Sequence, residues 1–287
     1  MKRWISVLCA ALMVLSCLAL TACGNDKQSS GASTESTEPV KQTLRVGMEC
    51  DYAPFNWTQT EKNDRTVAIK GGGYADGYDV QIAKKIADGL GMELQIVKLD
   101  WASLEGPALN AGQIDLVVAG MSPLQDRKET IDFSDNYYVS DLVIVVRKDG
   151  AFANAKELSD FKDAKITGQL GTFHYDVIDQ IEGVSKQTAM ETFPDMVVAL
   201  SSGKIDGYVS ERPGALSAVA SNSDLTFIAF DEGKGFTYDV DEVSIAVGVK
   251  KGSDLTAKVN TVLAGISQEE RDQMMKDALA NQPLSEE

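Results

Sequence analysis

The stretch Gly112–Tyr138 reads GQIDLVVAGMSPLQDRKETIDFSDNYY. Its short apolar run, residues 116–119, is bounded by turn-forming residues, which is typical of a buried strand. The run ends in the small-residue turn Gly120-Met121-Ser122, and Arg127 follows in a polar segment. A guanidinium group binds both oxygens of a carboxylate at once, so this strand end predicts a carboxylate receptor. Taken alone, the stretch favours a surface arginine at the start of a helical turn; the rest of the chain changes that interpretation.

An internal repeat indicates two lobes of similar topology. Residues 108–115 (ALNAGQID) and 199–206 (ALSSGKID) share Ala, Leu, Gly, Ile and Asp at identical spacing. Each copy is typical of a helix end, a Gly C-cap and the start of a buried strand. Ligands bind beyond the carboxyl ends of strands in open α/β folds, so we expect Gly120 and Glu211, at equivalent places after the two copies, to face one site. A chance similarity between two short α/β units is the alternative.

The rest of the pattern alternates strands with helices, which predicts an α/β fold with mainly parallel sheets. Strands are expected at residues 44–48, 94–99, 165–169, 205–209 and 244–249, and helices at residues 79–90, 103–111, 175–181, 193–201, 213–220, 254–266 and 268–281. The polar segment 56–73 predicts a hairpin, and the apolar run 139–146 is expected to carry the chain to the second lobe. The sequence has no Walker loop, no His/Cys metal spacing and no Gly-x-Ser-x-Gly motif, so we expect no cofactor and no metal site.

The N-terminal segment is predicted to be a lipoprotein signal. Two basic residues precede an apolar run at residues 5–20, which is typical of a secretory signal. The run finishes in Leu20-Thr21-Ala22-Cys23-Gly24, which resembles a bacterial lipobox. Residues 1–22 are then a signal peptide, and Cys23 carries several acyl chains that anchor the protein durably. A cleaved signal with a chance cysteine is the alternative. The polar residues 23–42 predict a flexible tether.

The charge and the cysteine content of the chain argue against nucleic-acid binding and against a disulfide framework. The formal net charge is −16, and loss of the signal removes two further positive charges, so the chain repels nucleic acid and anionic lipid headgroups. Cys9 and Cys17 leave with the signal and Cys23 is acylated, which leaves Cys50 without a disulfide partner. No His or second Cys lies near Cys50 in the sequence, so we interpret it as a small buried apolar residue rather than a nucleophile.

Four further motifs accompany the stretch around Arg127: Tyr52-Ala53-Pro54-Phe55, Gly77-Tyr78-Asp79-Val80, Gly171-Thr172 and Gly203-Lys204-Ile205-Asp206. From Thr43 onward, the chain resembles the extracytoplasmic amino-acid-binding proteins of bacterial ABC importers, solute-binding protein family 3. The resemblance implies a two-lobed periplasmic-binding-protein-like fold of type II with two hinge crossovers. Lobe 1 would comprise residues 43–138 plus 236–287, and lobe 2 residues 139–235.

The resemblance also implies a function without chemistry. The lobes would close on a free amino acid by hinge motion and deliver it to the membrane subunits of an ABC permease. The protein would be a monomer on the extracytoplasmic face of the cell membrane, held there only by its lipid, with no nucleic acid partner and no enzymatic activity.

A binding site for the amino acid head group follows from the resemblance. Arg127 would bind the ligand's α-carboxylate. Backbone and hydroxyl groups of Gly120, Met121, Ser122, Thr172 and Phe173 would complete this clamp. Glu211, where the family usually has Asp, would pair with the α-ammonium group.

The side-chain pocket is implied by three more residues. Tyr52 and Trp101 would form its aromatic walls, although the segment from Trp101 to Leu109 is one residue longer than the family's usual pattern. Glu49 matches a position that is acidic in relatives binding Arg, Lys or His, so a basic amino acid is expected. A carboxylate there would be poorly paired by an apolar ligand.

Other interpretations stay open. Glutamine, another polar amino acid or cystine are alternative ligands. An exported enzyme on the same fold, similar to the cyclohexadienyl dehydratases, would draw its general acid from Glu49, Glu211 or His174; otherwise His174 is expected to be a surface or cap residue. A sensor or adhesin ectodomain is the third class.

Overall fold

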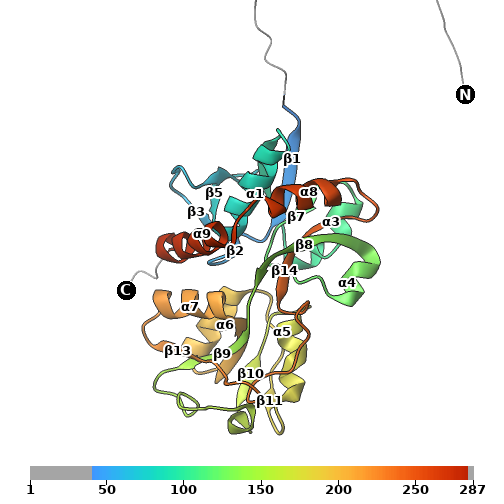
Figure 1. Cartoon of the computed structure of the whole chain (residues 1–287). Helices are drawn as coiled ribbons and strands as arrows, with labels where there is room; N and C mark the ends of the chain where they lie inside the picture. The colour runs from blue at the N-terminus through green and yellow to red at the C-terminus, as the bar shows by residue number, and fades with distance from the viewer. Residues whose placement is uncertain (1–40, 284–287) are drawn as a thin grey trace, which may run out of the picture. The chain divides into compact units, whose positions relative to one another are not determined.

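The computed structural model describes residues 41–283, which belong to one compact unit. The predicted signal peptide 1–22, the lipidation site Cys23 and the tether up to residue 40 lie outside the described residues, as does the end of the chain from residue 284. The described part is a two-lobed α/β structure with two five-stranded sheets and one four-stranded sheet. Figure 1 shows one five-stranded sheet in the upper part of the molecule and the other in the lower part.

The first lobe is built on the sheet β6-β1-β7-β14-β8. Its strands are β6 (Glu93–Lys98), β1 (Thr43–Met48), β7 (Leu116–Val117), β14 (Ser244–Lys250) and β8 (Ile131–Val139). Four of them run in the same direction and β14 runs against them. The helices of this lobe are α1 (Tyr78–Gly89), α2 (Trp101–Leu104), α3 (Pro107–Asn110), α4 (Gln125–Thr130), α8 (Leu255–Ala264) and α9 (Gln268–Asn281).

The second lobe repeats this plan with the sheet β11-β10-β12-β9-β13. Its strands are β11 (Ser185–Lys186), β10 (Lys165–Thr167), β12 (Gly207–Glu211), β9 (Leu142–Arg147) and β13 (Leu225–Ile228), and β9 runs against the other four. Its helices are α5 (Phe173–Asp176), α6 (Phe193–Ser201) and α7 (Arg212–Ser221), with 3-10 helices η1 (Leu158–Phe161) and η2 (Val177–Gln180). The predicted fold class is confirmed by these two mostly parallel sheets.

The chain crosses between the lobes twice. It passes from β8 to β9 at residues 140–141 and returns between β13 and β14. The amide of Ser140 donates a hydrogen bond of 3.1 Å to the carbonyl of Val243, so the two crossing segments lie side by side. The lobe boundaries predicted at residues 139 and 236 remain predictions.

The internal repeat has the structural meaning expected of it. Its two copies lead into β7 and β12, which occupy the third position of their sheets. The Asp115 amide donates to the Arg45 carbonyl at 2.8 Å, and the Arg45 amide donates to the Asp115 carboxylate at 2.9 Å. Asp206 does the same with Lys165, also at 2.9 Å. Each repeated aspartate therefore fixes the start of the neighbouring strand in its lobe.

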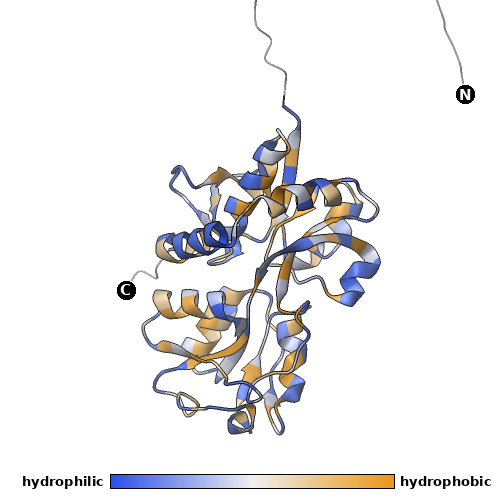
Figure 2. Ribbon diagram, in the orientation of Figure 1, coloured by the Kyte–Doolittle hydropathy of each residue, from blue (hydrophilic) through white to orange (hydrophobic). Residues whose placement is uncertain are grey.

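The hydrophobic core continues from one lobe into the other. Strand β9 is apolar from Leu142 to Val146, and these side chains alternate between two clusters, as those of a strand buried on both faces must. Figure 2 shows this strand and β14 mainly in hydrophobic colours, whereas the exposed side of α9 is hydrophilic. The ring of Tyr52 in the first lobe stacks on Phe193 of α6 at a centroid distance of 4.3 Å.

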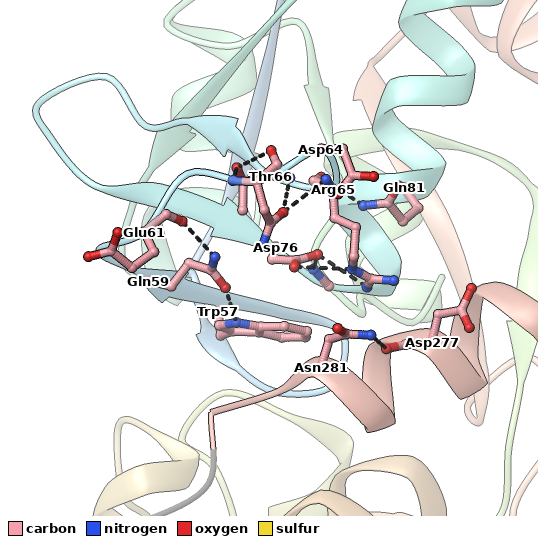
Figure 3. A network of polar contacts seen from close by, with 12 residues as sticks. Trp57, Gln59, Glu61, Asp64, Arg65, Thr66, Asp76, Gln81, Asp277 and Asn281 are labelled. Atoms are coloured by element: carbon pink, nitrogen blue, oxygen red, sulfur yellow. Dashed lines mark hydrogen bonds and ion pairs between the residues drawn. The ribbon is translucent and has the colours of Figure 1, made fainter.

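A small sheet replaces the hairpin predicted at residues 56–73. It has the order β2-β3-β5-β4, with β2 (Asp51–Tyr52), β3 (Asn56–Gln59), β5 (Tyr74–Asp76) and β4 (Val67–Ala68). Figure 3 shows the Arg65 side chain reaching the fully buried carboxylate of Asp76, at 3.2 Å, while Gln81 donates to the Arg65 carbonyl at 2.9 Å. This network fixes the small sheet to the beginning of α1 and so holds strand β2, which carries Tyr52.

Most helices fall where the sequence predicts them, and α9 matches residues 268–281 throughout. Two predicted helices are interrupted. The helix expected at residues 103–111 is divided into α2 and α3 because Gly106, at φ 144°, leaves helical geometry and Pro107 begins a new helix. The helix expected at residues 175–181 instead begins at Phe173 as α5 and continues as the 3-10 helix η2.

Candidate functional site

Arg127 is held at the beginning of α4 with 6% of its side chain exposed. Its Nη1 donates to the Ser122 carbonyl at 3.1 Å, and its Nη2 donates to the carbonyl of Gly171, in the second lobe, at 3.0 Å. The Glu105 carboxylate accepts from Nε and Nη2 at 3.2 and 2.9 Å. The guanidinium also lies 5.0 Å from the ring centre of Trp101, a favourable cation–π distance. Arg127 is thus a rigid cationic group with oxygen partners from both lobes.

Glu211 supplies the opposite charge. It ends β12, keeps 3% exposure, and accepts a hydrogen bond from the Tyr52 hydroxyl of the first lobe. His174 Nε2 lies 2.8 Å from its Oε1. Burial alone would raise the pKa of Glu211, but the charge of His174 and the hydrogen bonds from His174 and Tyr52 hold that pKa below its ordinary value. The contacts of Glu211 thus favour the ionised carboxylate in a buried position.

The Gly120 turn brings the first lobe's backbone close to Tyr52. Gly120 has φ 63°, and a Cβ added there would lie 2.9 Å from Cε1 of Tyr52, so only glycine is accommodated. The fully buried Asp79 carboxylate accepts a hydrogen bond from the Gly120 backbone and from the Tyr137 hydroxyl at 2.7 Å. Burial raises the pKa of Asp79 to about 6 against these hydrogen bonds. Asp79 thus fixes the turn that precedes Ser122.

Glu49 lies at the carboxyl end of β1, with 7% exposure. Its carboxylate accepts from Nε2 of Gln169, in the second lobe, at 3.1 and 3.4 Å. Burial raises the pKa of Glu49 to about 7, although the Gln169 hydrogen bond and Lys98 oppose the rise. Gln169 also donates to the Glu191 carbonyl at 3.0 Å, so this amide is fixed from two sides.

Two cavities meet at Trp101. A small one of about 10 Å³ is lined by Tyr52, Trp101, Gly120, Ser122, Arg127, Gln169, Thr172, Phe173 and His174. A larger one of about 550 Å³ is lined by residues of both lobes, including five acidic ones: Glu49, Asp51, Asp100, Glu105 and Glu191. Lys98 is the one basic residue among those that line it. The second cavity is therefore strongly acidic.

Seven predicted ligand residues line the small cavity, and Glu49 lines the large one beside Trp101. Glu211 reaches the same place through its contacts with Tyr52 and His174. The Met121 side chain is fully buried in the core and lines neither cavity, although its carbonyl accepts from Ala246. The ligand-binding roles of these residues stay predictions.

His174 corrects one expectation, and Gln169 was missed. His174 is buried beside Glu211 rather than a surface or cap residue, because α5 begins at Phe173, two residues before the predicted start, and so includes His174. Gln169 follows the end of β10 and precedes the Gly171 turn, so its place at a strand end was the available signal. Cys50 is a free, buried cysteine as predicted, and burial raises the pKa of its thiol to about 12.

Two sheets of one topology, with paired ionic groups where the lobes meet, define a two-lobed binding protein. The family of bacterial extracellular solute-binding proteins, family 3, matches residues 44–279, and the chain belongs to this family. It is 31% identical over 265 residues to the arginine-binding extracellular protein ArtP of Bacillus subtilis (strain 168), covering 92% of each chain.

Two further comparisons agree with this assignment. Identity is 30% over 244 residues to a probable histidine-binding protein of Campylobacter jejuni, with 84% of this chain and 87% of the relative covered. The crystal structure of an amino acid ABC transporter substrate-binding protein from Streptococcus pneumoniae bound to L-arginine superposes with a TM-score of 0.71 at 28% identity. That superposition covers 83% of this chain and 94% of the other.

Within residues 41–283, no cluster of three or more His, Cys, Asp or Glu side chains is arranged to hold a metal ion. None of the helices in that range is both long and apolar enough to cross a membrane.

Proposed function

We propose that this protein is the receptor of an ABC importer and captures a free basic amino acid between its lobes by hinge closure. The observation that carries the ligand class is the acidic cavity of about 550 Å³, with Glu49 in its wall. A cationic side chain is attracted to such a cavity, whereas an apolar one would leave its carboxylates without partners.

The head group of the ligand would be bound by the two buried ionic residues. Arg127 would take the α-carboxylate, together with the Gly120–Ser122 turn, Thr172 and Phe173. Glu211 would take the α-ammonium group, and Tyr52 and Trp101 would pack on the side chain. The names of relatives that bind arginine or histidine support the basic class.

The protein would carry out no reaction and would interact with the membrane subunits of an ABC permease as a monomer. The rival enzyme would use the buried pair Glu211 and His174, whose facing atoms lie 2.8 Å apart, as an acid–base pair. Mass spectrometry of candidate ligands after incubation with the protein separates the two functions, because only an enzyme changes their mass or quantity.

The ligand class is tested by a thermal-shift screen of the mature chain against the standard amino acids, cystine and citrulline. A ligand at one hundred times its Kd should stabilise the protein by roughly 2.7 kcal/mol. Stabilisation by arginine, lysine or histidine is expected. Stabilisation by glutamine or cystine alone would contradict the basic class.

Anchoring rests on the Leu20-Thr21-Ala22-Cys23 motif, which lies outside the described residues. We expect Cys23→Ser to release the protein from the membrane fraction or to block its processing. A variant that still fractionates with membrane and incorporates a lipid probe would contradict the anchor.

A further inference from the structure

Glu105 lies between Trp101 and Leu109, in the segment that the sequence comparison suggested is one residue longer than the family's usual pattern. It follows α2, and Gly106 then separates α2 from α3 where one helix was expected. This break directs the Glu105 side chain toward Arg127 rather than along a helix surface. Its side chain keeps 30% exposure and also lines the acidic cavity.

The Glu105 carboxylate occupies the edge of Arg127 that a ligand would need. A guanidinium group has five N–H donors, and a carboxylate binds best to two parallel ones. Nη1 and one N–H of Nη2 are directed to the carbonyls of Ser122 and Gly171. Nε and the other N–H of Nη2 form a parallel pair, and both donate to Oε1 of Glu105. A ligand's α-carboxylate therefore competes with Glu105 for the same edge.

Displacement leaves Glu105 in the acidic cavity. It already lines that cavity with Glu49 and Glu191. With a neutral ligand, the displaced Glu105 carboxylate no longer contacts Arg127 and is surrounded by other carboxylates of the cavity. With a cationic ligand, the side-chain cation replaces Arg127 as that partner.

We propose that Glu105 is a selectivity residue that holds Arg127 until a ligand's carboxylate replaces it, and that it then pairs with the cationic side chain of the ligand. This inference rests on the proposed amino-acid function. In this arrangement, a neutral amino acid that binds Arg127 leaves Glu105 without a cationic partner, so its binding is weakened. A basic amino acid binds Arg127 with its α-carboxylate and Glu105 with its side-chain cation, so the two contacts support each other.

The test compares arginine with citrulline, its neutral isostere, by calorimetry on the mature protein. Glu105→Gln should lower the Kd for citrulline, because the competing charge is removed. It should leave the Kd for arginine unchanged or raise it, because the new cationic partner is also lost. The preference for arginine over citrulline should fall at least roughly tenfold, the size of one charged hydrogen bond.

Glu191→Gln is the matched control, since Glu191 lines the same cavity but is not bonded to Arg127. It should weaken arginine binding and leave citrulline within about twofold, as expected for a general loss of negative charge in the cavity. If Glu105→Gln behaves like Glu191→Gln, with citrulline unchanged, the proposal is overturned. Glu105→Ala provides a second variant, for which the same tightening of citrulline is required.

The role of Glu105 and the proposed ligand class can fail independently of each other in this test. A wild-type protein that binds neutral amino acids and no cationic one would overturn the basic class. In that case Glu105→Gln must still tighten the neutral ligand, because competition for Arg127 does not depend on the ligand's side chain. No tightening would reject the role of Glu105 by itself.

Discussion

Gln169 of the second lobe donates its side-chain amide to the Glu49 carboxylate of the first, with Nε2 3.1 Å from Oε1. The contact joins the carboxyl ends of β1 and β10 in the two lobes. Because an amide is neutral, it hydrogen-bonds the Glu49 carboxylate without supplying a counter-charge. Glu49 is thus a buried acid that still favours a cation, which gives it consequences for both stability and binding.

The first prediction concerns stability without ligand. Burial raises the pKa of Glu49 from 4.5 to about 7, so the folded protein favours the protonated form. The contribution of protonated Glu49 to the free energy of unfolding is fully present below pH 4.5 and is lost as the pH rises to about 7. Glu49→Gln should therefore stabilise the protein above pH 7, by up to about 3 kcal/mol, and have little effect below pH 4.5. Denaturant unfolding of both proteins at the two pH values measures this. An equal difference at both would mean that Glu49 is not titrating in this range.

The second prediction concerns selectivity. Glu49→Gln preserves the shape of the side chain but removes its charge, so the loss of affinity should be confined to cationic ligands, at about 1–3 kcal/mol. Binding of arginine should also release a proton at pH 6, where Glu49 is mainly protonated, and none at pH 8. Calorimetry in two buffers of different ionisation enthalpy reports this release. Equal losses for arginine and glutamine would indicate a structural role for Glu49 and remove the preference for basic ligands.

The third prediction concerns the head-group residues. Arg127→Ala should weaken amino acid binding by roughly 2–5 kcal/mol, because the ligand's carboxylate is left buried without its partner. Glu211→Gln should weaken binding through the ammonium group. Arg147→Ala is the control, since Arg147 pairs with Asp149 and lines neither cavity. Unchanged affinity in both site variants would refute the amino-acid assignment.

Most of the architecture could be predicted from the sequence, because the hydrophobic patterns of helices and strands and the internal repeat are local features. The matching copies at residues 108–115 and 199–206 predicted two lobes, and the structure gives their aspartates the same bonding role. Strand ends near Gly120 and Glu211 could be matched for the same reason. Helix interruption at Gly106 was a weaker signal, since an isolated glycine is compatible with a helix at a modest free-energy loss.

Contacts between residues that are distant in the sequence could not be predicted in this way. Glu105 and Arg127 are separated by 22 residues, and Gln169 and Glu49 by 120, so neither pairing has a sequence period. His174 was expected to be a surface or cap residue following Phe173. Its burial depends on the partner Glu211, which only the folded structure brings to it.

The fourth prediction isolates the close approach of the Gly120 turn to Tyr52. Gly120 and Gly112 have nearly the same backbone angle, φ 63° and 68°, but a Cβ at Gly112 meets nothing within 4 Å. Alanine at either position should cost about 1–2 kcal/mol for left-handed geometry. Only Gly120→Ala should also displace Tyr52, whose hydroxyl is bonded to Glu211, and so reduce ligand affinity. Unfolding measurements and ligand titrations on both variants separate the two effects. If the two variants bind ligand equally well, the contact between the turn and Tyr52 does not position the site.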